Sequence, residues 1–64
     1  MEKMFEFVVP GEIVSLYNHG THVVEISLFL DDRHTLEPHS AILSHEEAQK
    51  RIIELRRRQD LTSN

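Results

Sequence analysis

The spacing of hydrophobic and polar residues over the first part of the chain is typical of β-strands. Residues 4–9 alternate well enough to be predicted as a strand. Three of its apolar side chains share one face: Phe5, Phe7 and Val9. Pro10 and Gly11 interrupt the pattern, because proline lacks a backbone donor and glycine tolerates positive φ. Residues 12–17 form a second predicted strand.

Residues 21–30 form the clearest predicted strand, because their β-branched side chains disfavour a helix. One face carries apolar residues alone: Val24, Ile26, Leu28 and Leu30. The other face is mixed: Val23, Glu25, Ser27 and Phe29. Turns are expected at 18–20 and 31–34. A last strand over 35–43 contains Pro38, so we expect it to be short, or to lie at an edge or a bulge.

Residues 44–59 are predicted to form an α-helix. Ser44 is a suitable N-cap, and Glu47 completes a capping box with it. Glutamate precedes a basic residue by four positions three times, a spacing that stabilises helices: Glu46–Lys50, Glu47–Arg51 and Glu54–Arg58. The arginines at 56–58 fall in the last predicted turn, where positive charge suits the helix dipole.

Together these elements predict an α+β fold, a small antiparallel sheet of three to four strands followed by one C-terminal helix. The helix would pack on the sheet through an apolar stripe: Ala48, Ile52 and Leu55. We expect residues 1–64 to form a single small domain, with strands over about 4–43, the helix over about 44–59 and a frayed tail over 60–64.

The length of the chain makes its core small. A chain of 64 residues buries only about 60% of the surface that its unfolded form exposes. Small domains compensate with disulfides, a metal or a partner subunit, and the sequence contains no cysteine. We therefore expect a homodimer. The lack of cysteine, of a secretory signal and of a long apolar segment makes the cytoplasm the expected location.

Charge is distributed unevenly along the chain. Residues 1–47 carry two basic and nine acidic side chains, a net charge of −7, whereas residues 48–64 carry five basic and two acidic, a net charge of +3. The basic end suggests an alternative function in binding RNA or DNA through its cationic residues: Lys50, Arg51, Arg56, Arg57 and Arg58. Two observations argue against nucleic-acid binding. Glutamates stand four residues before several of these basic residues, and no aromatic residues accompany them.

Two apolar residues are not needed by the predicted fold. Ile53 lies about 100° round the helix from Ile52, so it is either an isolated exposed side chain or part of a dimer seam or partner groove. Phe29 shares its strand face with polar residues and is either core or partner surface. The candidate partner-binding residues are therefore Ile53, Arg56, Arg57 and Phe29.

The sequence carries no clear catalytic, cofactor or metal motif. His19 and His22 flank a predicted turn at a spacing that could chelate a metal, but no further tight ligand pair accompanies them, so no metal site is predicted. Asp31, Asp32 and His34 could form an acid–base cluster, although aspartate in a short polar turn more often caps its own backbone. We expect no enzymatic activity and no cofactor.

Several residues resemble the carbon-storage-regulator family of RNA-binding proteins: Met4-Phe5, Gly11-Glu12, Pro38, Ile42-Leu43, Glu46-Glu47 and Arg51-Ile52. The resemblance implies an intertwined, strand-rich homodimer ending in a helix. That family contacts RNA through basic residues in the first strand and at the start of the helix. Here those places hold 7–9 and 44–45, which contain no arginine, so the resemblance does not extend to RNA binding.

These observations favour a small non-enzymatic regulatory module that acts as a homodimer through protein–protein contacts. Nucleic-acid binding through the basic helix is the alternative, and histidine-based metal binding is a third.

Overall fold

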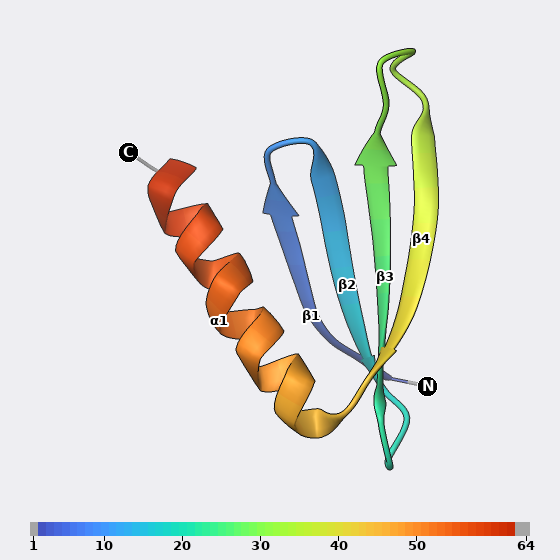
Figure 1. Cartoon of the computed structure of the whole chain (residues 1–64), viewed down its shortest axis with the longest axis vertical. Coiled ribbons are helices and arrows are strands. Elements are labelled where there is room, and N and C mark those ends of the chain that lie inside the picture. The colour runs from blue at the N-terminus through green and yellow to red at the C-terminus, as the bar shows by residue number, and fades with distance from the viewer. Residues whose placement is uncertain (1, 63–64) are drawn as a thin grey trace.

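The computed structural model describes residues 2–62, apart from the side chain of Thr62. Four strands precede one helix: β1 (Glu2–Val9), β2 (Glu12–Asn18), β3 (Val23–Leu30), β4 (Leu36–Leu43) and α1 (His45–Thr62). The strands form one antiparallel sheet in the order β1-β2-β3-β4 (Figure 1). The predicted α+β fold, with a four-stranded sheet and a C-terminal helix, is confirmed.

The turns follow the local chemistry of their residues. Pro10 and Gly11 join β1 to β2, and Gly11 has a φ of 80°, the conformation that a type II turn requires of its third residue. Between β2 and β3, Gly20 also has positive φ, and its amide donates to the Asn18 Oδ1 at 2.8 Å. Asp31 accepts from the amides of residues 33 and 35, so it caps its own turn.

β4 lies at an edge of the sheet, which is where a strand containing Pro38 was expected. It is eight residues long, so of the predicted alternatives the structure shows the edge position and not a short strand. Each strand pairs with its neighbour in sequence. The sheet is therefore complete within one chain, and it does not require the exchange of strands implied by the family resemblance.

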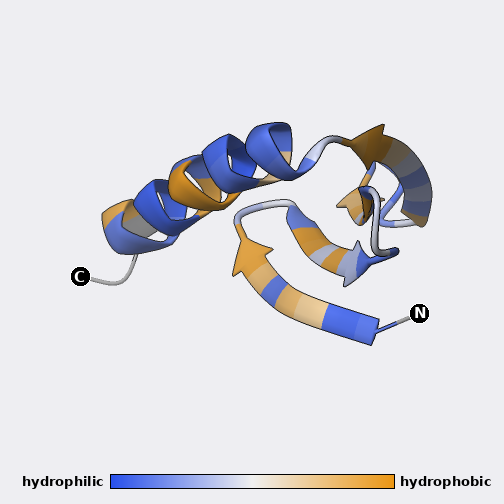
Figure 2. Ribbon diagram, turned by 90° about the horizontal axis from the view of Figure 1, so that it is seen from below, coloured by the Kyte–Doolittle hydropathy of each residue, from blue (hydrophilic) through white to orange (hydrophobic). Residues whose placement is uncertain are grey.

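One face of the sheet and α1 share a small core. It consists of Phe7, Val9, Val14, Leu16 and Val23 from the strands, and Ala48 and Leu55 from the helix. Ile52 packs against this cluster, which confirms the predicted apolar stripe of the helix. The helix lies on one side of the curved sheet, nearest β1 (Figures 1 and 2). Every residue of β4 is exposed except Leu43, which is half-buried.

The capping box forms as predicted at the start of the helix. The amide of Glu47 donates to the Ser44 hydroxyl at 3.0 Å, and the amide of Ser44 donates to Glu47 Oε1 at 3.0 Å. At the other end the helix continues to Thr62, so residues 60–62, for which a frayed tail was expected, are helical. Residues 63–64 of that expected tail lie outside the described residues.

The longer helix also changes the position of its charges. The last turn contains no basic residue, because Arg56, Arg57 and Arg58 precede it. The predicted match between arginines and the C-terminal end of the helix dipole is therefore wrong. No helix within residues 2–62 is long and apolar enough to cross a membrane.

Candidate interaction surfaces

The exposed side of α1 carries most of the predicted partner-binding residues. Ile53 is 59% exposed and lines a shallow hollow with Lys50, Glu54 and Arg57. A second hollow beside it is lined by Ile53, Arg56 and Phe5, among others. The structure thus brings three of the four predicted residues together. We call Lys50, Ile53, Arg56 and Arg57 the helix flank.

Arg56 is held over the sheet by an aromatic side chain. Its guanidinium lies 5.6 Å from the centre of the Phe5 ring, within the range of a cation–π interaction. Phe5 in turn stacks on Phe7, with ring centres 6.0 Å apart. The contact orients the Arg56 guanidinium at the border between helix and β1 while leaving the residue exposed.

Phe29 lies apart from the helix flank. In β3 it pairs with Glu12 of β2 and Glu37 of β4, and it faces the side of the sheet on which α1 packs. Its ring meets the His39 ring edge-on at 5.0 Å, and the residue remains 39% exposed. The hollows that Ile53 lines do not include Phe29, so the four predicted residues do not form one site.

Two of the arginines proposed for nucleic acid bind the sheet instead. Arg58 Nη1 lies 2.6 Å from Glu12 Oε1, and Arg51 Nε lies 2.7 Å from Glu25 Oε1. Arg51 also reaches Glu54 at 3.3 Å and Glu12 at 4.0 Å. Burial lowers the pKa of Arg51, but the hydrogen bond and charge of Glu25, with the other two carboxylates, outweigh this and raise it.

The predicted charge pairs within the helix are therefore largely replaced. Of the three, Glu46–Lys50 forms, at 3.9 Å. Arg51 and Arg58 turn to Glu25 and Glu12 on the sheet rather than to the glutamates four residues before them. The alternation of β2 contained the signal for this, because Glu12 shares a face with Val14 and Leu16 and must enter the core beside them.

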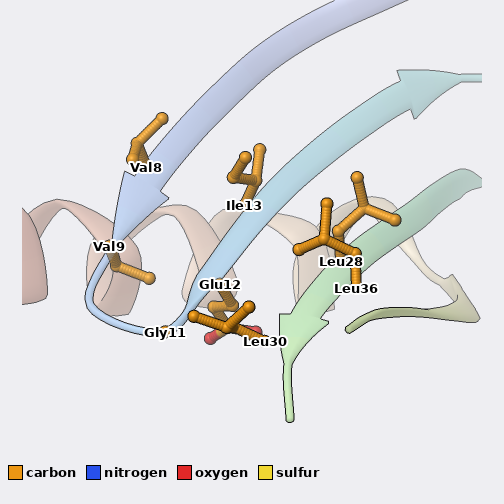
Figure 3. Close-up of a pocket in the computed structure, with 8 residues that line it drawn as sticks. All are labelled: Val8, Val9, Gly11, Glu12, Ile13, Leu28, Leu30 and Leu36. Atoms are coloured by element: carbon orange, nitrogen blue, oxygen red, sulfur yellow. The ribbon is translucent and has the colours of Figure 1, made fainter. Parts of the chain in front are cut away.

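The face of the sheet opposite α1 has no cover within the described chain. The register places one set of apolar side chains on this face: Val8, Ile13, Tyr17, Val24, Ile26, Leu28, Leu30, Leu36 and Ile42. We call this set the uncovered face. Figure 3 shows Val8, Ile13 and Leu28 side by side on neighbouring strands, on the side away from the helix.

The uncovered face is partly exposed and nearly free of charge. Val8, Leu36 and Ile42 are 63%, 53% and 75% exposed. A hollow of about 190 Å³ lies among its side chains, near the turn between β1 and β2. Among the strand residues on this side the only charged ones are Lys3 and Glu6, which pair with each other at 2.8 Å in the edge strand β1.

The alternation of side chains in β3 predicts one apolar face and one mixed face, but not which of the two the helix covers. The face with more apolar residues is the one left uncovered, whereas the helix packs on the face of Val23 and Ser27, both of which are buried. The pattern alone could not show this, because alternation predicts two faces without indicating which of them the helix will cover.

The two histidines considered as metal ligands, His19 and His22, stack on each other. The rings of His19 and His22 stack with centres 5.1 Å apart and planes 9° from parallel, so the two rings face each other instead of directing their nitrogens toward one point. His45 Nε2 lies 2.6 Å from the Gly20 carbonyl oxygen. Within residues 2–62 no three metal-binding side chains lie close enough together to hold an ion.

Comparisons with protein families, with characterised proteins and with solved structures found no match to this chain. The likeness to the carbon-storage-regulator family therefore rests on the short motifs alone.

Proposed function

We propose that this chain is a small non-enzymatic regulatory module that acts as a homodimer and binds another protein. The observation that carries this proposal is the balance of apolar residues. Eight large hydrophobic side chains are exposed in the described part of the chain, against seven hydrophobic residues in the core. Single exposed apolar residues are common, but contiguous ones mark sites of interaction.

The exposed apolar residues lie on two sides of the molecule, which supports two kinds of contact. Val8, Leu30, Leu36 and Ile42 belong to the uncovered face. Ile53 belongs to the helix flank, where cationic side chains surround it. In this proposal one surface serves self-association, and the helix flank serves a partner protein. A cytoplasmic location is part of the proposal and rests on the absence of cysteine.

The arrangement of the arginines leaves fewer cationic side chains available for the alternative function, nucleic-acid binding. Arg51 and Arg58 are paired with carboxylates of the sheet, so phosphate would have to compete with these pairs. Lys50, Arg56 and Arg57 remain on the exposed helix flank. Binding through three charges would depend steeply on salt, and this dependence separates the alternative from protein binding.

Capture from an extract of the source cell tests the proposal. The full chain is immobilised, and retained protein and nucleic acid are both measured at low and high salt. We expect a protein to be retained with little dependence on salt, and to be lost with Ile53→Asp. Leu61→Asp is the matched control, because Leu61 is also exposed, at 73%, and lies near the end of the same helix.

Two results would contradict the proposal. One is retention of RNA or DNA that falls steeply with salt and disappears in an Arg56→Ala/Arg57→Ala variant. The other is equal loss of the captured protein with Ile53→Asp and Leu61→Asp, which would show that any added charge on the helix removes it. Circular dichroism of each variant shows whether the fold is retained.

A further inference from the structure

We infer that the uncovered face is the self-association surface, and that a second copy of this chain covers it face to face. This inference rests on the homodimer of the proposed function and names the surface that forms it. In the resulting dimer two sheets pack against each other, and both α1 helices lie on the outside. The helix flanks then remain free for the partner protein.

The charge on this face favours a second copy over a different partner. The chain carries a net charge of −4, so two copies repel each other through most of their surfaces. On the uncovered face the charged strand residues are Lys3 and Glu6, and these already neutralise each other. Two copies can therefore meet here without bringing like charges together or burying an unpaired one.

The area of the face is sufficient for a stable dimer. Four strands about 4.8 Å apart, each of about eight residues with a rise of about 3.4 Å, give a face of roughly 500 Å² in projection. Two copies would remove roughly 1,000 Å² from water in total, the level that a biological interface should reach. The chain alone exposes 4741 Å², more than the roughly 4,250 Å² expected of a folded monomer of its mass.

The arrangement of residues on the face is compatible with packing against an identical copy. Its central row consists of Ser15, Ile26 and Ser40, which are register partners across β2, β3 and β4. Larger side chains form the rows on either side: Ile13, Leu28 and Pro38, and Tyr17, Val24 and Ile42. When two twisted sheets meet through their apolar faces, their strands cross at about −30°. A two-fold axis near Ile26 makes the contact self-complementary.

Sedimentation velocity of three variants tests the inference. Ile42→Lys and Val8→Lys place a charge at opposite edges of the uncovered face, and both residues are already exposed in the single chain. Ile53→Lys is the matched control on the helix flank, at 59% exposure. We expect a two-chain mass for the unmodified chain. Each face variant should raise the dissociation constant by about 100-fold, since a dimer buries the new charge twice, and Ile53→Lys should change it by less than about threefold.

The other outcomes separate this inference from the proposed function. A dimer that dissociates with Ile53→Lys and persists with Ile42→Lys and Val8→Lys overturns the inference and the assignment of the helix flank to a partner protein, whereas the homodimer itself stands. A single-chain mass for the unmodified protein at about 100 µM overturns both the inference and the homodimer, while protein capture is tested independently. If a lysine variant unfolds by circular dichroism, Val8→Ser and Ile42→Ser replace it, with at least tenfold weaker association expected.

Discussion

Glu12 shows how a single side chain of the sheet changes the role of the helix arginines. Its side chain is 5% exposed, and one of its carboxylate oxygens, Oε2, is buried without a hydrogen-bond partner among the described residues. A buried carboxylate is costly without a counter-charge. An exposed pair between Glu54 and Arg58 on the helix would contribute only about 0.2–0.5 kcal/mol. Neutralising the buried Glu12 carboxylate outweighs the exposed helix pair, so Arg58 pairs with Glu12.

We therefore predict that Arg58 and its neighbour Arg57 differ sharply in their effect on stability. Arg58→Ala should lower the free energy of unfolding by about 1–3 kcal/mol, because it leaves the Glu12 carboxylate buried with Arg51 at 4.0 Å as its remaining counter-charge. Arg57→Ala, at an exposed position, should change it by less than about 0.5 kcal/mol. Urea denaturation measures both, and equal values for the two variants would show that the Glu12–Arg58 pair does not stabilise the fold.

The helix begins at a point fixed by its own residues. Ser44 and Glu47 satisfy each other's amides, and this reciprocal capping ends β4 and starts α1 within two residues. The end of the helix has no comparable signal, because no glycine or proline follows Gln59. The helix accordingly continues to Thr62, beyond the predicted boundary.

The capping box makes part of the stability dependent on pH. The hydrogen bonds from the Ser44 amide and hydroxyl lower the pKa of Glu47 below its ordinary value of 4.5. Its contribution is therefore fully present above pH 4.5 and is lost as the pH falls through the lowered pKa of the folded state. Unfolding in urea from about pH 7 to about pH 3 should show the unmodified chain losing its advantage over Glu47→Gln in this acid range.

Glu46→Gln is the control for this prediction. Glu46 lies in the same turn and pairs with Lys50 rather than with the backbone of Ser44. An identical pH dependence for the Glu46 and Glu47 variants would contradict a specific effect of the capping box.

In the molecule as a whole, one face of the sheet is covered by the helix and the other face is left uncovered. α1 packs on one face, chiefly against β1, and the small core lies between the helix and the sheet. The other face remains apolar and exposed. A chain of this length has little core to offset its conformational entropy, so burying the second face would add stability that the monomer lacks.

Stability should therefore depend on protein concentration. Association that occurs in the folded state and not in the unfolded state raises the midpoint of thermal unfolding as concentration rises. We expect this rise for the unmodified chain and for Ile53→Lys, and not for Ile42→Lys, over a range from about 1 to about 100 µM. A midpoint that stays constant for all three chains would show that self-association does not stabilise the fold.

Local patterns predicted a large part of this protein. The alternation of side chains placed the strands, Pro10 and Gly11 placed the first turn, Asp31 capped its own turn, and Ser44 with Glu47 placed the start of the helix. The apolar stripe of Ala48, Ile52 and Leu55 also packs as predicted. These features depend on contacts between residues close in sequence, or on the side-chain repeat of a strand or helix, which can be recognised within one short segment.

Other features depend on how the segments meet in three dimensions. Alternation could not say which face of β3 the helix would cover, and helix spacing could not show that Arg51 and Arg58 would bond to Glu25 and Glu12. Phe29 and Ile53 were grouped as apolar residues that the predicted fold does not need, yet they lie on different elements, and the two hollows lined by Ile53 do not include Phe29. Sequence periodicity fixes the directions of side chains within each element. The packing of α1 on one side of the sheet determines which side chains are buried, which charges pair, and which apolar face is left for a partner, because burial and charge pairing involve residues far apart in the chain.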